Sequence, residues 1–169
     1  MSWYPDKMVM SIDDRRQFLG KVDIFAHCKK RDLKALAKTC EERSFMPGQV
    51  ICRQGTRGVA MFVITRGTVR IAEEFENGGS AIVARLGPGA AVGEMAILDG
   101  AERTATVVAE DTVEALVLTS WDFKAMLRQR PEVALDILPV VVRRFRETAA
   151  ELRRLTSDGG AQREHRELP

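Results

Sequence analysis

The feature that most constrains the fold is a run of short apolar and β-branched segments separated by turns. The run begins at Glu41, where the helical spacing of apolar residues changes to an alternation of apolar and polar residues. Its turn sequences are Pro47-Gly48, Arg66-Gly67, Asn77-Gly78-Gly79 and Gly87-Pro88-Gly89. Asn-Gly favours tight hairpins, and many short strands at close spacing favour a sandwich or barrel-like roll. Since no βαβ alternation interrupts them, the pattern predicts an antiparallel rather than a parallel sheet.

The strands can be placed between these turns by their β-branched and apolar content. The expected strands span 49–53, 61–65, 68–72, 81–86, 105–109 and 113–118. Upstream, residues 13–26 and 31–39 carry apolar residues three or four positions apart, which predicts two helices. Asp13 or Asp14 is the expected N-cap of the first helix.

Helical spacing returns after the last strand. Ser120 can cap one helix, and Pro131 suits the first turn of the next. An apolar stripe then runs from Leu138 to Leu155 at spacings of three and four. Pro139 lies inside this stripe, and it is expected to kink the helix or to mark its effective start.

The candidate functional residues lie between Val92 and Ala109. Gly93 and Glu94 open a short apolar turn, and Arg103 follows after a loop. A guanidinium group can donate two parallel hydrogen bonds to a phosphate, whereas an ionised carboxylate accepts bonds from hydroxyls. The turn at Gly93 can also aim backbone N–H groups at an anion. These features together predict a pocket for a sugar-phosphate.

The run Gly93-Glu94-Met95-Ala96-Ile97-Leu98, followed by Arg103-Thr104-Ala105-Thr106-Val107, resembles the phosphate-binding cassette of the cyclic nucleotide-binding domain family. That family includes catabolite-activator-type regulators, protein kinase regulatory subunits and cyclic nucleotide-gated channels. The resemblance implies that Arg103 binds the cyclic phosphate, that Glu94 binds the ribose 2′-hydroxyl, and that amides near Gly93 and Ala105 reach the phosphate oxygens. The ligand-binding residues expected from it are Gly93, Glu94, Met95, Ala96, Arg103, Thr104 and Ala105.

One departure from the family's pattern and one alternative interpretation stay open. Glu102 stands where many relatives have proline, although some bacterial members carry an acid there. Glu94 and Arg103 can also be an ion pair in a β-roll that has lost its ligand. Thr104 resembles the hydroxyl that helps to hold the guanine of cGMP, yet it also suits a strand as a β-branched residue. The general likeness to bacterial members favours cAMP, with some binding of cGMP.

The resemblance, which covers roughly residues 22–155, implies a mainly β fold. The expected fold is an antiparallel β-roll, of jelly-roll or double-stranded β-helix type, with N-terminal helices and a C-terminal helical segment. Residues 13–155 would form the cyclic nucleotide-binding domain, with the roll at 41–119 and the C-terminal helices at 120–155. Residues 1–12 would be an extension, and the polar residues 156–169 a disordered tail.

Composition narrows the class of protein. A chain of 169 residues, 45% apolar and 30% charged, suits one soluble domain with a real core. Its net charge of +2 does not favour nucleic acid or membranes as partners, and neither a signal peptide nor a spanning segment is visible. Three cysteines without metal-ligand spacing indicate a reduced, cytoplasmic protein. Without a catalytic or cofactor motif, a metal site or an enzyme is not expected.

The domain is predicted to signal to other proteins through its C-terminal helix. Its apolar stripe needs a partner surface, either the β-roll near the ligand or the same helix of a second chain. A protein effector or a homodimer is the expected partner. Specific DNA binding is not expected, because only 14 residues follow Leu155. The arginines of this helix, interleaved with glutamates, are interpreted as a solvated face. A ligand-free scaffold, or a fragment of a larger cAMP-responsive regulator, remains the alternative.

Overall fold

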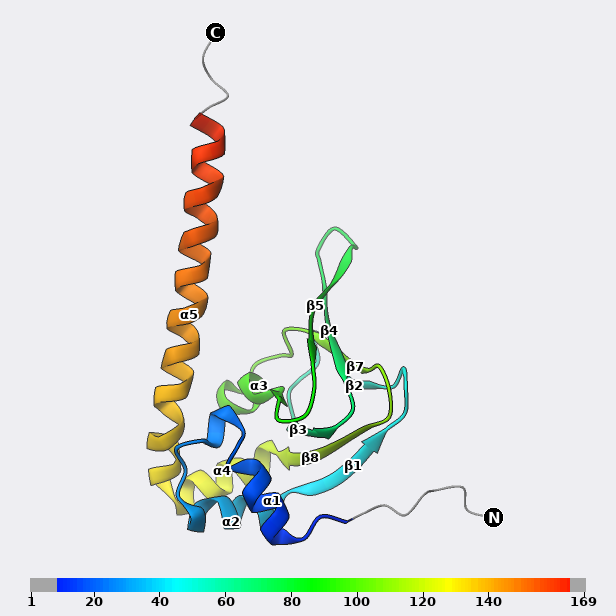
Figure 1. Cartoon of the computed structure of the whole chain (residues 1–169), viewed down its shortest axis with the longest axis vertical. Coiled ribbons are helices and arrows are strands. Elements are labelled where there is room, and N and C mark those ends of the chain that lie inside the picture. Colours follow the sequence, from blue (N-terminus) through cyan, green and yellow to red (C-terminus); the bar gives the residue numbers. More distant parts are fainter. Residues whose placement is uncertain (1–8, 165–169) are drawn as a thin grey trace, which may run out of the picture.

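The computed structural model describes residues 9–164, and its strands form two four-stranded antiparallel sheets (Figure 1). The sheet orders are β1-β8-β3-β6 and β2-β7-β4-β5. The strands are β1 (Glu41–Phe45), β2 (Val50–Cys52), β3 (Ala60–Arg66), β4 (Val69–Glu74), β5 (Ser80–Leu86), β6 (Ala91–Val92), β7 (Thr106–Ala109) and β8 (Val113–Thr119). This architecture confirms the predicted antiparallel β-roll. The short strands β1 and β6 were not predicted individually.

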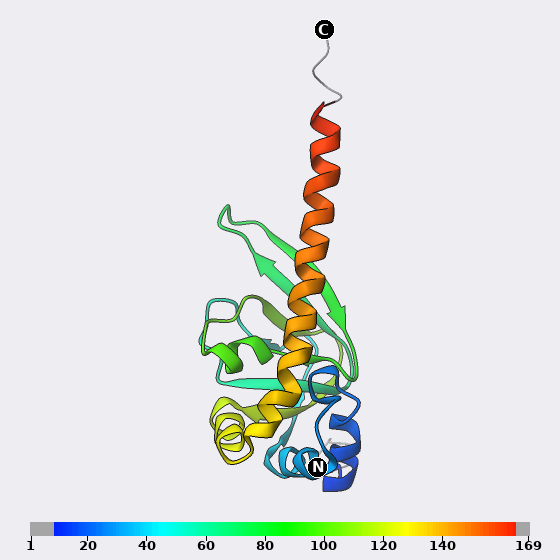
Figure 2. The same ribbon diagram turned by 90° about the vertical axis from the view of Figure 1, so that its left-hand side faces the viewer.

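Helices flank the roll on both sides in sequence, as predicted. Before the roll lie α1 (Ile12–Leu19), the 3₁₀ turn η1 (Asp23–Phe25) and α2 (Lys30–Thr39), and after it lie α4 (Ser120–Gln129) and α5 (Pro131–Glu164). One further short helix, α3 (Glu94–Asp99), lies between β6 and β7. In both ribbon views α1, α2 and α4 gather at one end of the roll, and α5 rises from that end alongside it (Figures 1 and 2).

Strands β3 and β8 are buried on both faces, which explains their nearly continuous apolar sequences. On β3, Met61 and Val63 pack in the core shared with the helices. The alternate residues Phe62 and Ile64 pack inside the roll. The ring of Phe62 meets that of Phe45 edge to face at 5.8 Å. This alternation fastens the helices to one side of the sheet and closes the roll on the other.

The N-terminal helix is shorter than predicted. The expected segment 13–26 divides into α1 and η1, separated by Gly20 at the helix C-cap. The N-cap is Ser11 rather than Asp13 or Asp14, because its hydroxyl accepts from Asp14 N at 3.1 Å. The Ser11 hydroxyl also donates to the Asp14 carboxylate at 2.6 Å, so Ser11 and Asp14 are joined by two hydrogen bonds at the start of the helix.

The C-terminal helices also differ from expectation. Thr119, not Ser120, caps α4 through its side chain. Helix α5 begins at Pro131 as predicted, so Pro139 lies inside it and does not mark its start. Residues 156–164 are helical where a disordered tail was expected, and 165–169 lie outside the described residues. Extending a formed helix needs no new nucleus, so two glycines need not end it.

Helix α5 has two different faces. Val133, Ile137 and Val140 are buried against the domain, in contact with η1 and α4. Leu138 and Phe145 are exposed, Phe145 by 73%. The apolar stripe predicted from the sequence, here represented by Leu138 and Phe145, therefore faces solvent and is distinct from the residues that fasten α5 to its own domain.

A buried carboxylate joins α2 to the start of α5. Asp32 is 0% exposed, and its Oδ1 accepts a 2.6 Å bond from Arg130 Nη1. Arg31 approaches the same oxygen at 3.5 Å from the solvent side. Because Arg130 lies between α4 and α5, this pair fixes the corner from which α5 leaves.

We expect Arg130→Gln to lower the free energy of unfolding in urea by about 1–3 kcal/mol, because a buried carboxylate loses its main partner. The loss is below the ~3–5 kcal/mol of a fully buried pair, since Arg130 is partly exposed and Arg31 remains. Arg128→Gln, at an exposed site in the last turn of α4, is the matched control. Equal effects of the two substitutions would contradict this role for Asp32.

Candidate functional site

The predicted cassette folds as a strand, a short helix and a loop. The two-residue strand β6 pairs with β3 and leads directly into α3. Gly93 caps α3 with φ of +79°, a left-handed conformation that favours glycine. The apolar turn expected after Gly93 is thus a full helical element, and Ala96 and Ile97 bury it against the roll. This packing places Glu94 at a fixed point on the pocket rim.

Arg103 is the buried cation of the cassette, with only 7% of its surface exposed. Its Nη1 donates to Gly93 O at 2.8 Å, and its Nη2 donates to Ala60 O. A Cβ on Gly93 would lie 2.0 Å from Arg103 Nη1. The glycine is therefore required both by its backbone conformation and by the close approach of the guanidinium group.

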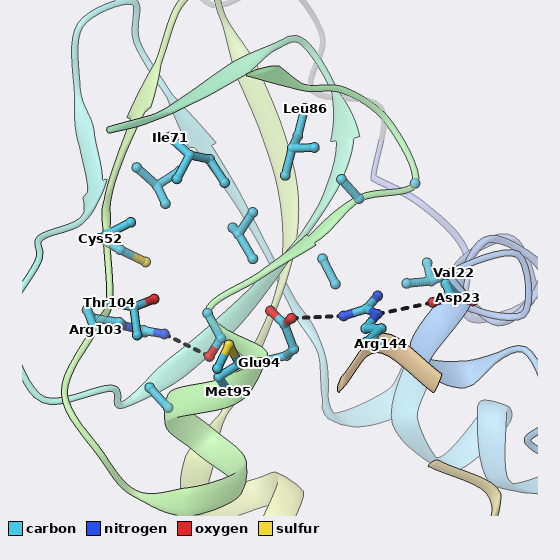
Figure 3. A pocket seen from close by; sticks show the side chains of 18 of the residues that line it. Val22, Asp23, Cys52, Ile71, Leu86, Glu94, Met95, Arg103, Thr104 and Arg144 are labelled. Atoms are coloured by element: carbon cyan, nitrogen blue, oxygen red, sulfur yellow. Dashed lines mark hydrogen bonds and ion pairs between the residues drawn. The ribbon is translucent and has the colours of Figure 1, made fainter. Parts of the chain in front are cut away.

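Glu94 does not pair with Arg103 in the part of the chain that the structure describes. Its Oε1 accepts a 2.9 Å bond from Nη1 of Arg144, on α5. Arg144 also donates through Nε to Asp23 Oδ2 at 3.2 Å (Figure 3). The cassette is thereby connected to the long helix and to η1, and the suggested Glu94–Arg103 ion pair is not the arrangement found.

These residues line a cavity of about 440 Å³, a size suited to a small organic ligand. Its charged and hydroxyl side chains, most of them labelled in Figure 3, are Asp23, Glu94, Glu102, Arg103, Thr104 and Arg144. Ile71, Leu86, Cys52 and Val107 contribute apolar walls. Burial raises the pKa of the Cys52 thiol above its ordinary value, and the charge of Arg103 offsets part of that rise. The thiol is therefore neutral near pH 7 and adds to the apolar wall.

The structure brings all the predicted site residues to this one cavity. The lining includes Gly93, Glu94, Met95, Ala96, Arg103, Thr104 and Ala105. Met95 and Thr104 are largely exposed at the rim, whereas Ala96 is buried. Strand β7 begins at Thr106 and not at Ala105, so Thr104 lies in a bend before the strand.

Sequence reasoning missed Asp23 and Arg144, which lie on η1 and α5, the helices that precede and follow the roll in sequence. Arg144 was grouped with the arginines of a solvated face. A signal for its inward position does exist, because Ile137, Val140 and Arg144 follow helical spacing along the buried face of α5. The sequence carries no comparable signal for Asp23.

The sequence matches the cyclic nucleotide-binding domain over residues 42–130, a little over half of the chain. The chain belongs to the cyclic nucleotide-binding domain family. This confirms the resemblance drawn from the cassette. The chain is 37% identical to the cyclic AMP receptor protein of Thermus thermophilus over 112 residues, which cover 66% of this chain and 52% of that protein.

A second relative is a cyclic nucleotide-gated potassium channel of Mesorhizobium japonicum, 36% identical over 81% of this chain and 34% of its own length. Among solved structures, the Thermus thermophilus catabolite activator protein superposes with a TM-score of 0.71 at 32% identity. That match covers 79% of this chain and 63% of the solved chain. The chain thus spans about half the length of the receptor protein and a third of the channel.

Two features of other protein classes are not found between residues 9 and 164. No helix there is both long and apolar enough to cross a bilayer. No group of three or more histidine, cysteine or acidic side chains in the same range could hold a metal ion.

We expect Gly93→Ala to lower the free energy of unfolding by about 1–3 kcal/mol more than Gly78→Ala, measured by urea unfolding. The two glycines have nearly the same φ, +79° and +81°, so the backbone strain of alanine is matched. Only Gly93 has the Arg103 guanidinium group in the space of the new Cβ, whereas nothing lies within 4 Å of that space at Gly78. Equal losses would show that Arg103 moves aside freely.

Proposed function

We propose that this domain is a non-enzymatic, cytoplasmic sensor that binds a 3′,5′-cyclic purine nucleotide, with cAMP preferred. The observation that carries the proposal is the joint position of Arg103 and Glu94 in one cavity of ligand size. A guanidinium group suits the cyclic phosphate, and a carboxylate suits the ribose 2′-hydroxyl. The names of the relatives from Thermus and Mesorhizobium support the same ligand class.

Arg103 is prepared for an anion before a ligand arrives. Its side chain is held by two backbone carbonyls, so binding costs little further loss of side-chain freedom. Its burial also limits screening by water and salt, which strengthens an interaction with phosphate. Cys52, whose charge state is neutral near pH 7, places no competing negative charge beside it.

The apolar walls suit the purine ring but say little about its identity. Ile71 and Leu86 can pack on adenine or guanine alike, because neither side chain offers a hydrogen bond. Thr104, at the rim, corresponds to the family position whose hydroxyl helps to hold the guanine of cGMP. The preference for cAMP therefore rests on the bacterial relatives, and cGMP is expected to bind more weakly.

The output element of the proposed sensor is α5. Its exposed residues Leu135, Leu138, Val142 and Phe145 are spaced three, four and three apart, the alternation of a coiled-coil seam. The sequence continues this spacing at Ala149 and Leu152. The stripe does not lie against the roll, and its coiled-coil spacing favours the same helix of a second chain over a separate effector.

The rival function is a β-roll scaffold without ligand, in which Glu94 and Arg144 only fasten α5. The same residues fit a ligand-binding module that is part of a larger cAMP-responsive regulator, consistent with the share of the relatives that the chain spans. Calorimetric titration with cAMP separates the scaffold from both binding alternatives.

We expect Arg103→Gln to weaken cAMP binding by more than tenfold, because a buried charged contact to the phosphate is worth about 2–5 kcal/mol. Isothermal titration calorimetry measures the affinity. Arg66→Gln, a substitution of the same type at a side chain that is 75% exposed, is the control. Equal affinity of the Arg103 variant and the parent would refute the assigned phosphate contact.

The same titrations test ribose and base recognition. Glu94→Gln should lower the affinity for cAMP and leave the affinity for 2′-deoxy-cAMP nearly unchanged. Only cAMP carries the 2′-hydroxyl from which Glu94 would accept a hydrogen bond. The parent should prefer cAMP to cGMP. A tenfold preference for cGMP would reverse the base assignment while leaving the ligand class intact.

We expect the parent to form a dimer that Phe145→Glu weakens by at least tenfold, because like charges would meet at the apolar seam. Sedimentation velocity across a concentration series measures the dissociation constant. Phe145 is 73% exposed, so the substitution should leave the fold intact. Ala150→Glu adds the same charge at an exposed position outside the seam and should leave the dimer unchanged. A monomeric parent would contradict the homodimer.

A further inference from the structure

Asp23 belongs to η1, far from the cassette in sequence, yet its side chain lines the cavity (Figure 3). Its two carboxylate oxygens have different partners. Oδ1 accepts from Arg143 Nη2, and Oδ2 accepts from Arg144 Nε at 3.2 Å. The neighbouring arginines thus hold the Asp23 carboxylate between them, and Asp23 holds the Nε side of Arg144.

Arg144 is shared between two acids. While its Nε bonds Asp23, its Nη1 bonds Glu94 Oε1 at 2.9 Å. A guanidinium group free of other partners tends to bind a carboxylate through two parallel hydrogen bonds, which occupy both oxygens. With Nε turned to Asp23, the contact between Arg144 and Glu94 is a single hydrogen bond.

We propose that Asp23 is a positioning residue for the ribose end of the cavity. By holding Nε of Arg144, it fixes the orientation of the guanidinium group, so that Arg144 meets Glu94 through the single Nη1 bond and Glu94 stays able to accept a ligand hydroxyl. The inference rests on the proposed function, in which Glu94 accepts the ribose 2′-hydroxyl. Its consequence is selective, because a ligand without that hydroxyl gains nothing from the acceptor that Asp23 protects.

The expected change in affinity on removing Asp23 depends on how exposed its ion pairs are. The side chains of Asp23, Arg143 and Arg144 are 49%, 46% and 37% exposed, so each ion pair is partly screened by water. Pairs of this kind are worth about 0.2–1 kcal/mol, which corresponds to at most about a fivefold change in affinity. A comparison between two ligands is therefore more informative than one affinity, because it cancels general effects on charge and stability.

The experiment titrates cAMP and 2′-deoxy-cAMP into the parent and into Asp23→Asn. We expect cAMP to weaken by about two- to fivefold and 2′-deoxy-cAMP to stay unchanged, so that the preference for the ribose ligand falls. Asp13→Asn removes the same charge and a 3.0 Å ion pair, with Arg16, outside the cavity. This control should leave both affinities and their ratio as in the parent.

A second pair of variants tests the route through Arg144. In an Arg144→Gln background the addition of Asp23→Asn should leave the ratio of the two affinities unchanged, since the residue through which Asp23 acts is gone. An equal change for both ligands, or tighter cAMP binding by Asp23→Asn, would overturn the inference. If the parent bound neither nucleotide, the proposed function would fail. If it bound cAMP with a ratio indifferent to Asp23, only this inference would fail.

Discussion

The hydrogen bonds from Arg103 to the carbonyls of Gly93 and Ala60 are the constraint on which the site depends. They join the loop before β7 to the cassette turn and to the central strand β3. A buried guanidinium group needs such acceptors, because burial without hydrogen bonds carries a large desolvation cost. The close approach of the guanidinium group also favours glycine at position 93. The proposed phosphate contact of Arg103 would thus be prepared by the backbone.

The central sheet gives this site a rigid support. Met61 and Val63 of β3 face the helices while Phe62 and Ile64 face the interior of the roll, so the strand that carries Ala60 is packed on both sides. Close-packed interiors resist small displacements. A ligand bound as proposed would therefore meet a nearly fixed guanidinium group at Arg103. Segments with fewer buried side chains can move more easily when a ligand binds. Helix α5 beyond Val140, where the apolar side chains are exposed, is such a segment.

The roll and the cassette could be predicted from the sequence because their signals are local. Alternation, turn glycines and the spacing from Gly93 to Arg103 all lie within short windows. The contacts of Arg144 could not be found in this way, since its partners Asp23 and Glu94 are 121 and 50 residues distant. The N-cap at Ser11 and the helical residues 156–164 were missed for a different reason. Helix ends depend on small differences between caps, and propensity alone does not resolve them.

Arg144 gives α5 a physical reason to respond to a ligand. A ligand shifts a conformational equilibrium only through different contacts with the two states. Ile137 and Val140 fasten the buried face of α5 regardless of the ligand, whereas Arg144 touches the carboxylate proposed to bind ribose. Any change in that carboxylate's partners alters the energy that holds Arg144 in place. Because the stripe of Leu138 and Phe145 lies on the exposed side of the same helix, a displacement begun at Arg144 would reach the proposed dimer seam through the helix itself.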